Sequence, residues 1–110
     1  MDVHYAAGLF EGEGNVTSYK TRATAQIAMT DLEPLERFQS AVGMGRAMGP
    51  YGPYQPNRKA FWRWAVTSQV EVVRLGELLS PLLSPRRRLQ FEAVVIQGLG
   101  RNRKKLEEEV

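Results

Sequence analysis

The segment from residue 6 to residue 14, Ala-Ala-Gly-Leu-Phe-Glu-Gly-Glu-Gly, constrains the fold of this chain more than any other. On a helix, Gly8 and Gly12 are four residues apart and share a face, so a second backbone can approach there closely. Glu13 falls at the helix end, where two crossing copies would bring two carboxylates together. Like charges in a partly dry site are costly unless a cation neutralises them, and carboxylate oxygens suit a hard ion such as Mg²⁺. The alternative is a helix that ends at a glycine cap with solvated acids nearby.

Length and composition exclude several kinds of protein. A chain of 110 residues can bury one modest core, which a symmetric partner would enlarge. It has no Cys and a single His, which excludes disulfides and the usual zinc clusters. No apolar run reaches membrane-spanning length, and the first residues lack the basic flank of a signal peptide. We therefore expect a cytoplasmic or otherwise intracellular protein with no membrane partner and no small-molecule cofactor.

The charges are segregated along the chain, although the formal net charge is only +3. No acid occurs between Gly14 and Thr30, or between Arg37 and Val70. The basic residues of these two windows are Lys20, Arg22, Arg37, Arg46, Arg58, Lys59 and Arg63. Such segregation makes one positive surface, which is the footprint of a polyanion binder. The alternative is a solvated basic face without a partner.

The same windows have the alternation of β-strands. Residues 22–30 alternate apolar and polar side chains, and residues 15–19 supply the polar face of a preceding strand. Residues 59–67 alternate as well, with both tryptophans on the side expected in the core. The partner of this strand lies around residues 45–54, next to a Gly/Pro-rich connection. The pattern predicts two β-hairpins.

Helices separate and follow these hairpins. Thr30 and Glu33 have the spacing of a capping box at the start of a helix, and Ser68 and Glu71 repeat it. A Ser-Pro pair at residues 84–85 can open the last helix. The predicted fold class is α+β, with the order α-β-β-α-β-β-α-α.

Residues 6–14 resemble the nonapeptide signature of LAGLIDADG homing endonucleases, and seven of the nine positions agree in identity or chemical type. The first position, usually Leu, is Ala6, and the two positions that usually hold Asp are Glu11 and Glu13. The predicted order of helices and strands is similar to one complete domain of this family. The resemblance therefore covers nearly the whole chain.

Only one copy of the motif is present, and the resemblance implies a homodimer that pairs through the motif helices. The antiparallel four-stranded sheet of each subunit would form a saddle over double-stranded DNA, with a target that is long and near-palindromic. The domain would span residues 1–100, followed by a charged tail, residues 101–110, that we expect to be frayed. The residues expected at the dimer contact are Ala7, Gly8, Glu11 and Gly12.

The resemblance also implies a chemistry, the metal-dependent hydrolysis of phosphodiester bonds by a sequence-specific DNA endonuclease. Glu13 of each subunit, with the carbonyl of Gly12, would hold Mg²⁺, and Mn²⁺ or Ca²⁺ could occupy the same site. Asp31 would orient solvent at the phosphate, cap the following helix, or do both. Arg86 would stabilise the transition state electrostatically, with Arg88 as the second choice, or would only contact phosphate.

The polar face of the sheet is the surface expected to bind DNA, because a two-stranded ribbon fits the major groove. Lys20, Arg58 and Lys59 lie near turns and are expected at phosphates, whereas Met48 and Phe61 could contact thymine methyls. The expected DNA contacts are Thr17, Tyr19, Lys20, Arg22, Thr24, Gln26, Arg46, Met48, Arg58, Lys59, Phe61, Arg63 and Arg88.

Two other functions remain open at this point. A catalytically inactive DNA-binding regulator, or an RNA splicing helper, would keep the fold and lose the chemistry. Both motif acids, Glu11 and Glu13, are present, which favours the nuclease. A protein-interaction module without nucleic acid would need the basic face to be incidental.

Overall fold

The structure is a computed structural model that describes residues 2–19 and 22–108, and the side chains of residues 2–18 and 22–97. The observed order of elements confirms the predicted α+β fold. In chain order the elements are α1 (Val3–Glu13), β1 (Gly14–Tyr19), β2 (Arg22–Met29), α2 (Leu32–Val42), β3 (Arg46–Tyr51), β4 (Phe61–Val66), α3 (Gln69–Leu79), the 3₁₀ helix η1 (Ser80–Leu82) and α4 (Pro85–Glu108). The boundary predicted after residue 100 stays a prediction. Lys20 lies outside the described residues.

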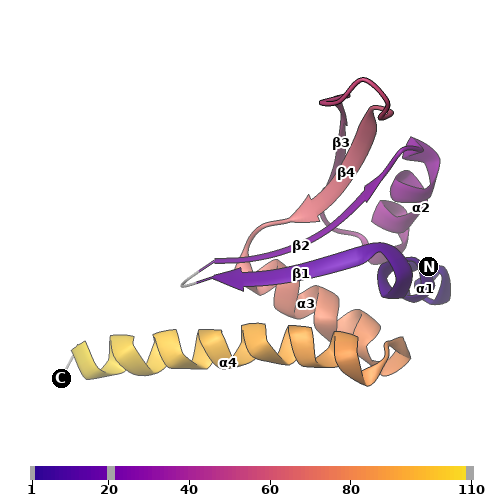
Figure 1. Cartoon of the computed structure of the whole chain (residues 1–110). Helices are drawn as coiled ribbons and strands as arrows, with labels where there is room; N and C mark the ends of the chain where they lie inside the picture. The colour runs from indigo at the N-terminus through magenta and orange to yellow at the C-terminus, as the bar shows by residue number, and fades with distance from the viewer. Residues whose placement is uncertain (1, 20–21, 109–110) are drawn as a thin grey trace.

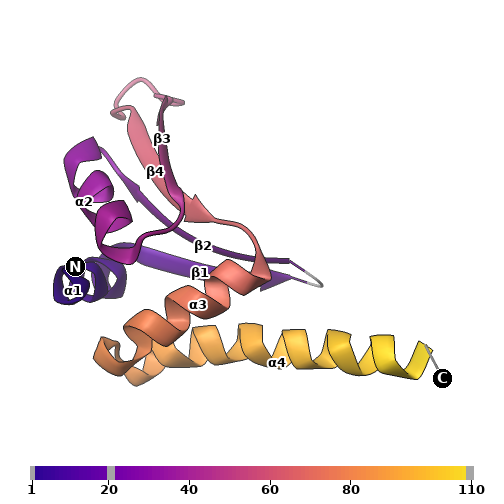
Figure 2. The ribbon, with the colours of Figure 1, turned by 180° about the vertical axis from the view of Figure 1, so that it is seen from behind.

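The four strands form one antiparallel sheet in the order β1-β2-β4-β3, so the two hairpins meet at β2 and β4. The sheet is bent, and the helices lie on one side of it (Figure 1). Seen from behind, α3 and the first half of α4 lie below the sheet (Figure 2), where α3 packs against β2 and α4 packs against β1 and α3. The helices of the described part of the chain do not cover the opposite face of the sheet (Figure 1 and Figure 2).

The core lies between the sheet and the helices. Alternate residues of β2 are buried, as the period of two predicted, and Trp64 on β4 is fully buried against them. The rings of Phe38 and Trp64 meet edge to face with centroids 4.6 Å apart, and Phe10 of α1 stacks on Phe38 at 6.2 Å. The indole N–H of Trp64 donates to the carbonyl of Met44 at 3.0 Å, which satisfies its buried polar atom. The core placement of the tryptophans is confirmed, since Trp62 packs against this cluster.

The predicted capping box at Thr30 and Glu33 is wrong. The N-cap of α2 is Asp31, and its side chain makes no capping hydrogen bond. From that position the third helical residue is Pro34, which has no N–H to donate to a cap. The equivalent prediction for α3 is confirmed, because the backbone N–H of Glu71 donates to Ser68 Oγ at 3.2 Å.

None of the helices in the described part of the chain combines the length and hydropathy needed to cross a bilayer.

Candidate functional site

Helix α1 has one face in the core and a glycine face that is open. Phe10 is fully buried, whereas Gly8 and Gly12 are exposed, and a Cβ built on either glycine would meet nothing within 4 Å. The chain itself therefore leaves room for another backbone on this face. Ala7, also expected at the dimer contact, is only 3% exposed and lies in the core of its own chain.

Glu13 is the last residue of α1 and is exposed. The next residue, Gly14, caps the helix by donating its N–H to the carbonyl of Phe10. A Cβ at Gly14 would come within 2.6 Å of the Phe10 ring, so only glycine fits directly after Glu13. The turn from α1 into β1 is therefore fixed by close packing, which holds Glu13 at the edge of the sheet.

Asp31 lies at the same end of the first hairpin as Glu13. Gly14, where β1 begins, pairs with Ile27, and β2 ends at Met29, two residues before Asp31. Both acids are exposed.

The donors at this end of the hairpin suit a divalent metal but are too few in one chain. A carboxylate and a backbone carbonyl are hard oxygen ligands of the kind that Mg²⁺ and Ca²⁺ bind. Within the described residues, no group of three or more His, Cys, Asp or Glu side chains comes together. The residues fit such an ion only if a second copy adds its own donors.

Glu11 faces the start of α4 within its own chain. Its carboxylate accepts hydrogen bonds from the backbone N–H of Ser84 and from Ser84 Oγ, the latter at 2.9 Å. These bonds, and the charges of Arg87 and Arg86, hold the pKa of Glu11 below its ordinary value, although desolvation acts in the other direction. Its expected place at a dimer contact stays a prediction.

Arg87 is a site residue that the sequence interpretation missed. It is only 7% exposed, and its Nε and Nη2 donate to the carbonyl of Glu11 at 3.3 and 3.2 Å. Its Nη1 donates to Gln90 Oε1 at 3.1 Å. The signal that could have found it is helical spacing, because Arg87 shares a face with Phe91 and Val94, which are both buried.

The two neighbouring arginines are exposed and face different surroundings. Arg86 acts on the Glu11 carboxylate through its charge, so it lies near the end of α1. Arg88 lines a hollow of about 230 Å³ between α3 and α4, together with Gly76 and Phe91. The structure therefore places Arg88 on the helical side of the sheet, away from the other expected DNA contacts.

The register of the sheet brings the expected DNA-binding residues of the strands onto one face. Thr17 pairs with Thr24, Gln26 with Ala65, and Met48 with Arg63, and cross-strand partners point to the same side. This face is opposite the core. The expected contacts in these rows are Thr17, Tyr19, Arg22, Thr24, Gln26, Arg46, Met48, Phe61 and Arg63, although the Tyr19 side chain is outside those described. Asn15, opposite Gln26, is a polar member of the row that was not among the expected contacts.

An aromatic cluster supports Arg63 on this face. The guanidinium carbon of Arg63 lies 5.6 Å from the ring centroids of both Tyr51 and Phe61. The two rings are themselves 5.7 Å apart, and Tyr54 lies 6.2 Å from Phe61. Such contacts attract the cation and restrict its rotamers. Tyr51 was also missed by the sequence interpretation.

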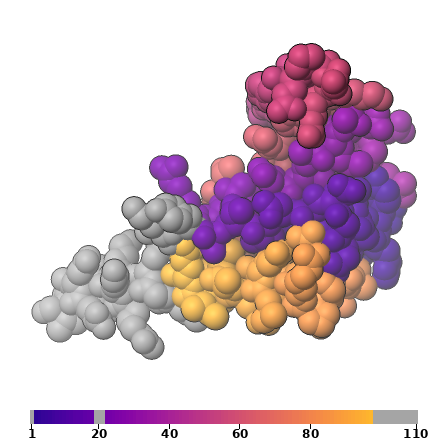
Figure 3. Space-filling model, viewed as in Figure 1, coloured from indigo at the N-terminus to yellow at the C-terminus, as the bar shows by residue number. Residues whose placement is uncertain are grey.

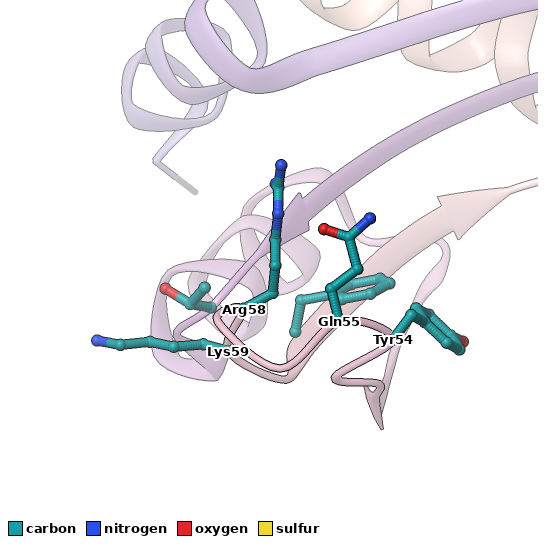
Figure 4. A pocket seen from close by; sticks show the side chains of 6 residues that line it. Tyr54, Gln55, Arg58 and Lys59 are labelled. Carbon is teal, nitrogen blue, oxygen red and sulfur yellow. The ribbon is translucent and has the colours of Figure 1, made fainter.

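The connection between β3 and β4 rises as a lobe from the rest of the surface (Figure 3). It carries a hollow of about 400 Å³ that is lined by Thr30, Tyr54, Gln55, Arg58, Lys59 and Phe61. Arg58 and Gln55 point the same way from the connection, while Tyr54 and Lys59 point to opposite sides (Figure 4). Both expected phosphate contacts in the described part of the chain, Arg58 and Lys59, thus lie beside the aromatic cluster.

No protein-family model and no curated protein matches the sequence. Solved structures do resemble it. The homing endonuclease I-CvuI in complex with its target has a TM-score of 0.65 and 16% identity, and the match covers 87% of this chain and 65% of that one. The archaeal intron-encoded homing endonuclease I-Vdi141I, complexed with DNA, has a TM-score of 0.65 and 23% identity. That match covers 87% of this chain and 66% of that one. The LAGLIDADG meganuclease I-AabMI, bound to uncleaved DNA, has a TM-score of 0.68 and 19% identity. That match covers 99% of this chain and 40% of that one.

These likenesses show that the chain has the LAGLIDADG endonuclease fold. It spans 65%, 66% and 40% of the length of the three structures.

Proposed function

We propose that this chain, with its LAGLIDADG fold, is one subunit of a homodimeric DNA endonuclease that cuts both strands of a long, near-palindromic site with the help of a divalent metal. The observation that carries the proposal is helix α1, whose open glycine face ends at the exposed carboxylate of Glu13. The solved structures that share the fold are described as complexes with DNA.

The open face of the sheet supports DNA binding. Its rows of polar and basic side chains have the spacing of a ribbon in the major groove, where alternate residues reach base edges. Arg58 and Lys59, at the hollow beside this face, would contact phosphates and fix the register of the duplex.

The glycine face supports pairing of two subunits. Without side chains at Gly8 and Gly12, two α1 helices can cross at close range and bring their two Glu13 residues together. The Gly12 carbonyl and Glu13 carboxylate of each subunit would then hold a divalent cation, which when bound supplies an activated water and neutralises charge on the phosphate.

Arg86 and Asp31 have supporting roles in this proposal. Arg86 is exposed and precedes Arg87, which bonds the Glu11 carbonyl near the end of α1, and from there its guanidinium would stabilise charge on the scissile phosphate. Asp31 makes no helix-capping bond, which leaves its carboxylate to orient water at the same place.

The test begins by selecting a target and continues with one matched pair of variants. Palindromic duplexes retained by the protein in Ca²⁺ are sequenced, and the best of them is incubated in Mg²⁺. We expect Glu13→Gln to slow cleavage at least about a hundredfold while retention stays within about threefold. The control is Glu33→Gln, which removes an exposed acid from the first turn of α2 and should cut like the wild type.

Undiminished cleavage by Glu13→Gln would contradict the proposal. Retention of a specific duplex without cleavage by the wild type would favour the inactive DNA-binding regulator.

A further inference from the structure

A buried arginine joins the end of α1 to the start of α4, and the proposed chemistry does not use it. Arg87 bonds the carbonyl of Glu11 through two nitrogens, and Ser84 bonds the carboxylate of the same residue through its N–H and hydroxyl. Ser84 Oγ also accepts the N–H of Arg87 at 3.4 Å. The carbonyl and the carboxylate of Glu11 are thus both hydrogen-bonded by residues at the start of α4.

The bonded carbonyl is next to the proposed metal ligands. The last carbonyls of a helix have no partner within the helix. In α1 the carbonyl of Phe10 accepts from the capping Gly14, and that of Glu11 accepts from Arg87. The next carbonyl belongs to Gly12 and the next side chain to Glu13. Fixing the Glu11 peptide therefore fixes the residue that precedes both proposed ligands.

Fold stability alone does not require this arrangement. Burying a guanidinium removes its hydration, and replacing a whole buried ion pair with apolar residues of similar volume is often neutral or stabilising. The position also has apolar neighbours, since the Arg87 guanidinium carbon lies 5.9 Å from the Phe10 ring centroid and Phe91 is buried one turn further along α4. A methionine could fill the same space, but the carbonyl of Glu11 would then lose the hydrogen bonds from Arg87. What the arginine adds is a defined orientation of the end of α1.

We propose that Arg87 and Glu11 are positioning residues, which lock the end of α1 to α4 and so set where Glu13 and the Gly12 carbonyl lie relative to Arg86. The catalytic part of this inference rests on the proposed function. The locking itself is a property of the free chain and can be tested without cleavage.

The experiment compares the wild type with Arg87→Met, Arg87→Lys and Glu11→Gln. The control is Arg74→Met, which removes an exposed arginine from α3. Circular dichroism and thermal melting identify the variants that fold. Amide hydrogen exchange at residues 12–14 then reports local opening of the helix end, and single-turnover cleavage over a range of Mg²⁺ concentrations reports metal use.

In Arg87→Met we expect exchange at residues 12–14 to be about tenfold faster and the Mg²⁺ concentration for half-maximal cleavage to be about tenfold higher, the size of effect typical of residues behind metal ligands. Duplex retention without metal should stay within about twofold of the wild type, since Arg87 lies away from the open sheet face. Arg87→Lys keeps the charge but not the two-nitrogen bond, so it should be intermediate. Glu11→Gln should also be intermediate, and Arg74→Met should match the wild type.

A folded Arg87→Met with wild-type exchange at residues 12–14 would overturn the inference, and so would an altered melting temperature with unchanged Mg²⁺ dependence. If Arg87→Met does not fold, amide exchange at residues 12–14 and the Mg²⁺ dependence of cleavage are measured in Arg87→Lys and Glu11→Gln instead, and wild-type values in both variants would overturn the inference. If the wild type cuts no duplex, the proposed function fails, and the exchange measurement still decides whether the lock exists.

Discussion

Glu11 and Glu13 are two residues apart in the motif, and their side chains have opposite environments. Successive residues of a helix are rotated by about 100°, so positions two apart point to nearly opposite sides. Glu11 turns toward α4 and is hydrogen-bonded there, whereas Glu13 is exposed at the helix end. Glu11 therefore links α1 to the start of α4, and Glu13 remains available for a ligand.

The Glu11 environment predicts a pH dependence of stability. Its pKa is lowered in the folded chain, so its stabilising contribution is complete above the unfolded value near 4.5 and is lost as the pH falls through the folded value. The pKa of Asp2 is also lowered, by its hydrogen bond with Arg37, so its contribution to stability is likewise lost in acid. We expect urea unfolding midpoints to fall below pH 5 less steeply in Glu11→Gln than in the wild type. Identical slopes for the two proteins would refute this assignment.

Arg63 predicts the identity of one base in each half-site. A guanidinium held over Tyr51 and Phe61 loses little freedom on binding, and arginine contacts guanine through two hydrogen bonds. Sequencing of retained duplexes should show guanine at one position per half-site. Arg63→Lys should lose about 1–3 kcal/mol of that preference, and Tyr51→Leu a smaller part. Tyr51→Phe keeps the ring and is the control; a wild-type library without such a guanine would exclude this role.

At the scale of elements, β2 and β4 were predictable because each has one face in the core and one toward solvent. That contrast gives β2 its visible period of two. The start of α2 was not predictable in this way. The capping-box spacing of Thr30 and Glu33 takes no account of Pro34, which has no backbone N–H. A short residue pattern predicts local structure only when no neighbouring residue opposes it, and here Pro34 opposes a helix start at Thr30.

The site was predictable only in part, for a related reason. The motif marks Glu13 and the glycines, because their roles depend on positions within one helix. The partner of Glu11 is Ser84, 73 residues away, and no local pattern connects them. Arg87 stands in a run of three arginines, which resembles a solvated surface until the buried face of α4 is known.

The close turn after α1 predicts a stability cost at Gly14. A methyl group there would lie within 2.6 Å of the Phe10 ring and the Phe10 carbonyl, both of which are fixed by the core. We expect Gly14→Ala to lower the free energy of unfolding by about 1–3 kcal/mol in a denaturant titration. A variant as stable as the wild type would show that the α1–β1 turn relaxes freely.

The open glycine face predicts the opposite result at Gly8. Leucine is a better helix former than glycine by up to about 1 kcal/mol, and a Cβ at this position meets nothing within 4 Å. Gly8→Leu should therefore melt no lower than the wild type as a monomer, yet sediment as a monomer at concentrations where the wild type pairs. Ser40→Leu, on the exposed side of α2, controls for an added surface leucine. Unchanged pairing of Gly8→Leu would place the contact elsewhere.

At the scale of the whole molecule, the chain is elongated, with extents of 55 × 31 × 23 Å. Helix α4 contributes to this shape, since its 24 residues span about 36 Å and continue past the first hairpin (Figure 1). The sheet face proposed to bind DNA lies opposite the helices, and the β3–β4 lobe extends beyond the ends of β3 and β4 (Figure 1). The basic side chains proposed to contact DNA are therefore spread over a long surface.

This distribution predicts a steep salt dependence of duplex binding. Each phosphate contact contributes about 0.9 to the slope of log K against log salt concentration. Replacing Arg58 and Lys59 with Gln removes two contacts per subunit, so the slope of a dimer should fall by about 4 while the preferred sequence stays the same. Gel shifts between 50 and 300 mM KCl measure it, and an unaltered slope would exclude these residues from phosphate contact.

The stripe of Gly8 and Gly12 has a further consequence for anyone who wishes to redirect the protein. If two identical chains meet there, every amino-acid change on the sheet is expressed twice, once over each arm of the target. A single codon then rewrites two base positions together, in mirrored places. Retargeting to a sequence with unlike arms would first require the two copies to be encoded separately, for example by tethering them in one polypeptide.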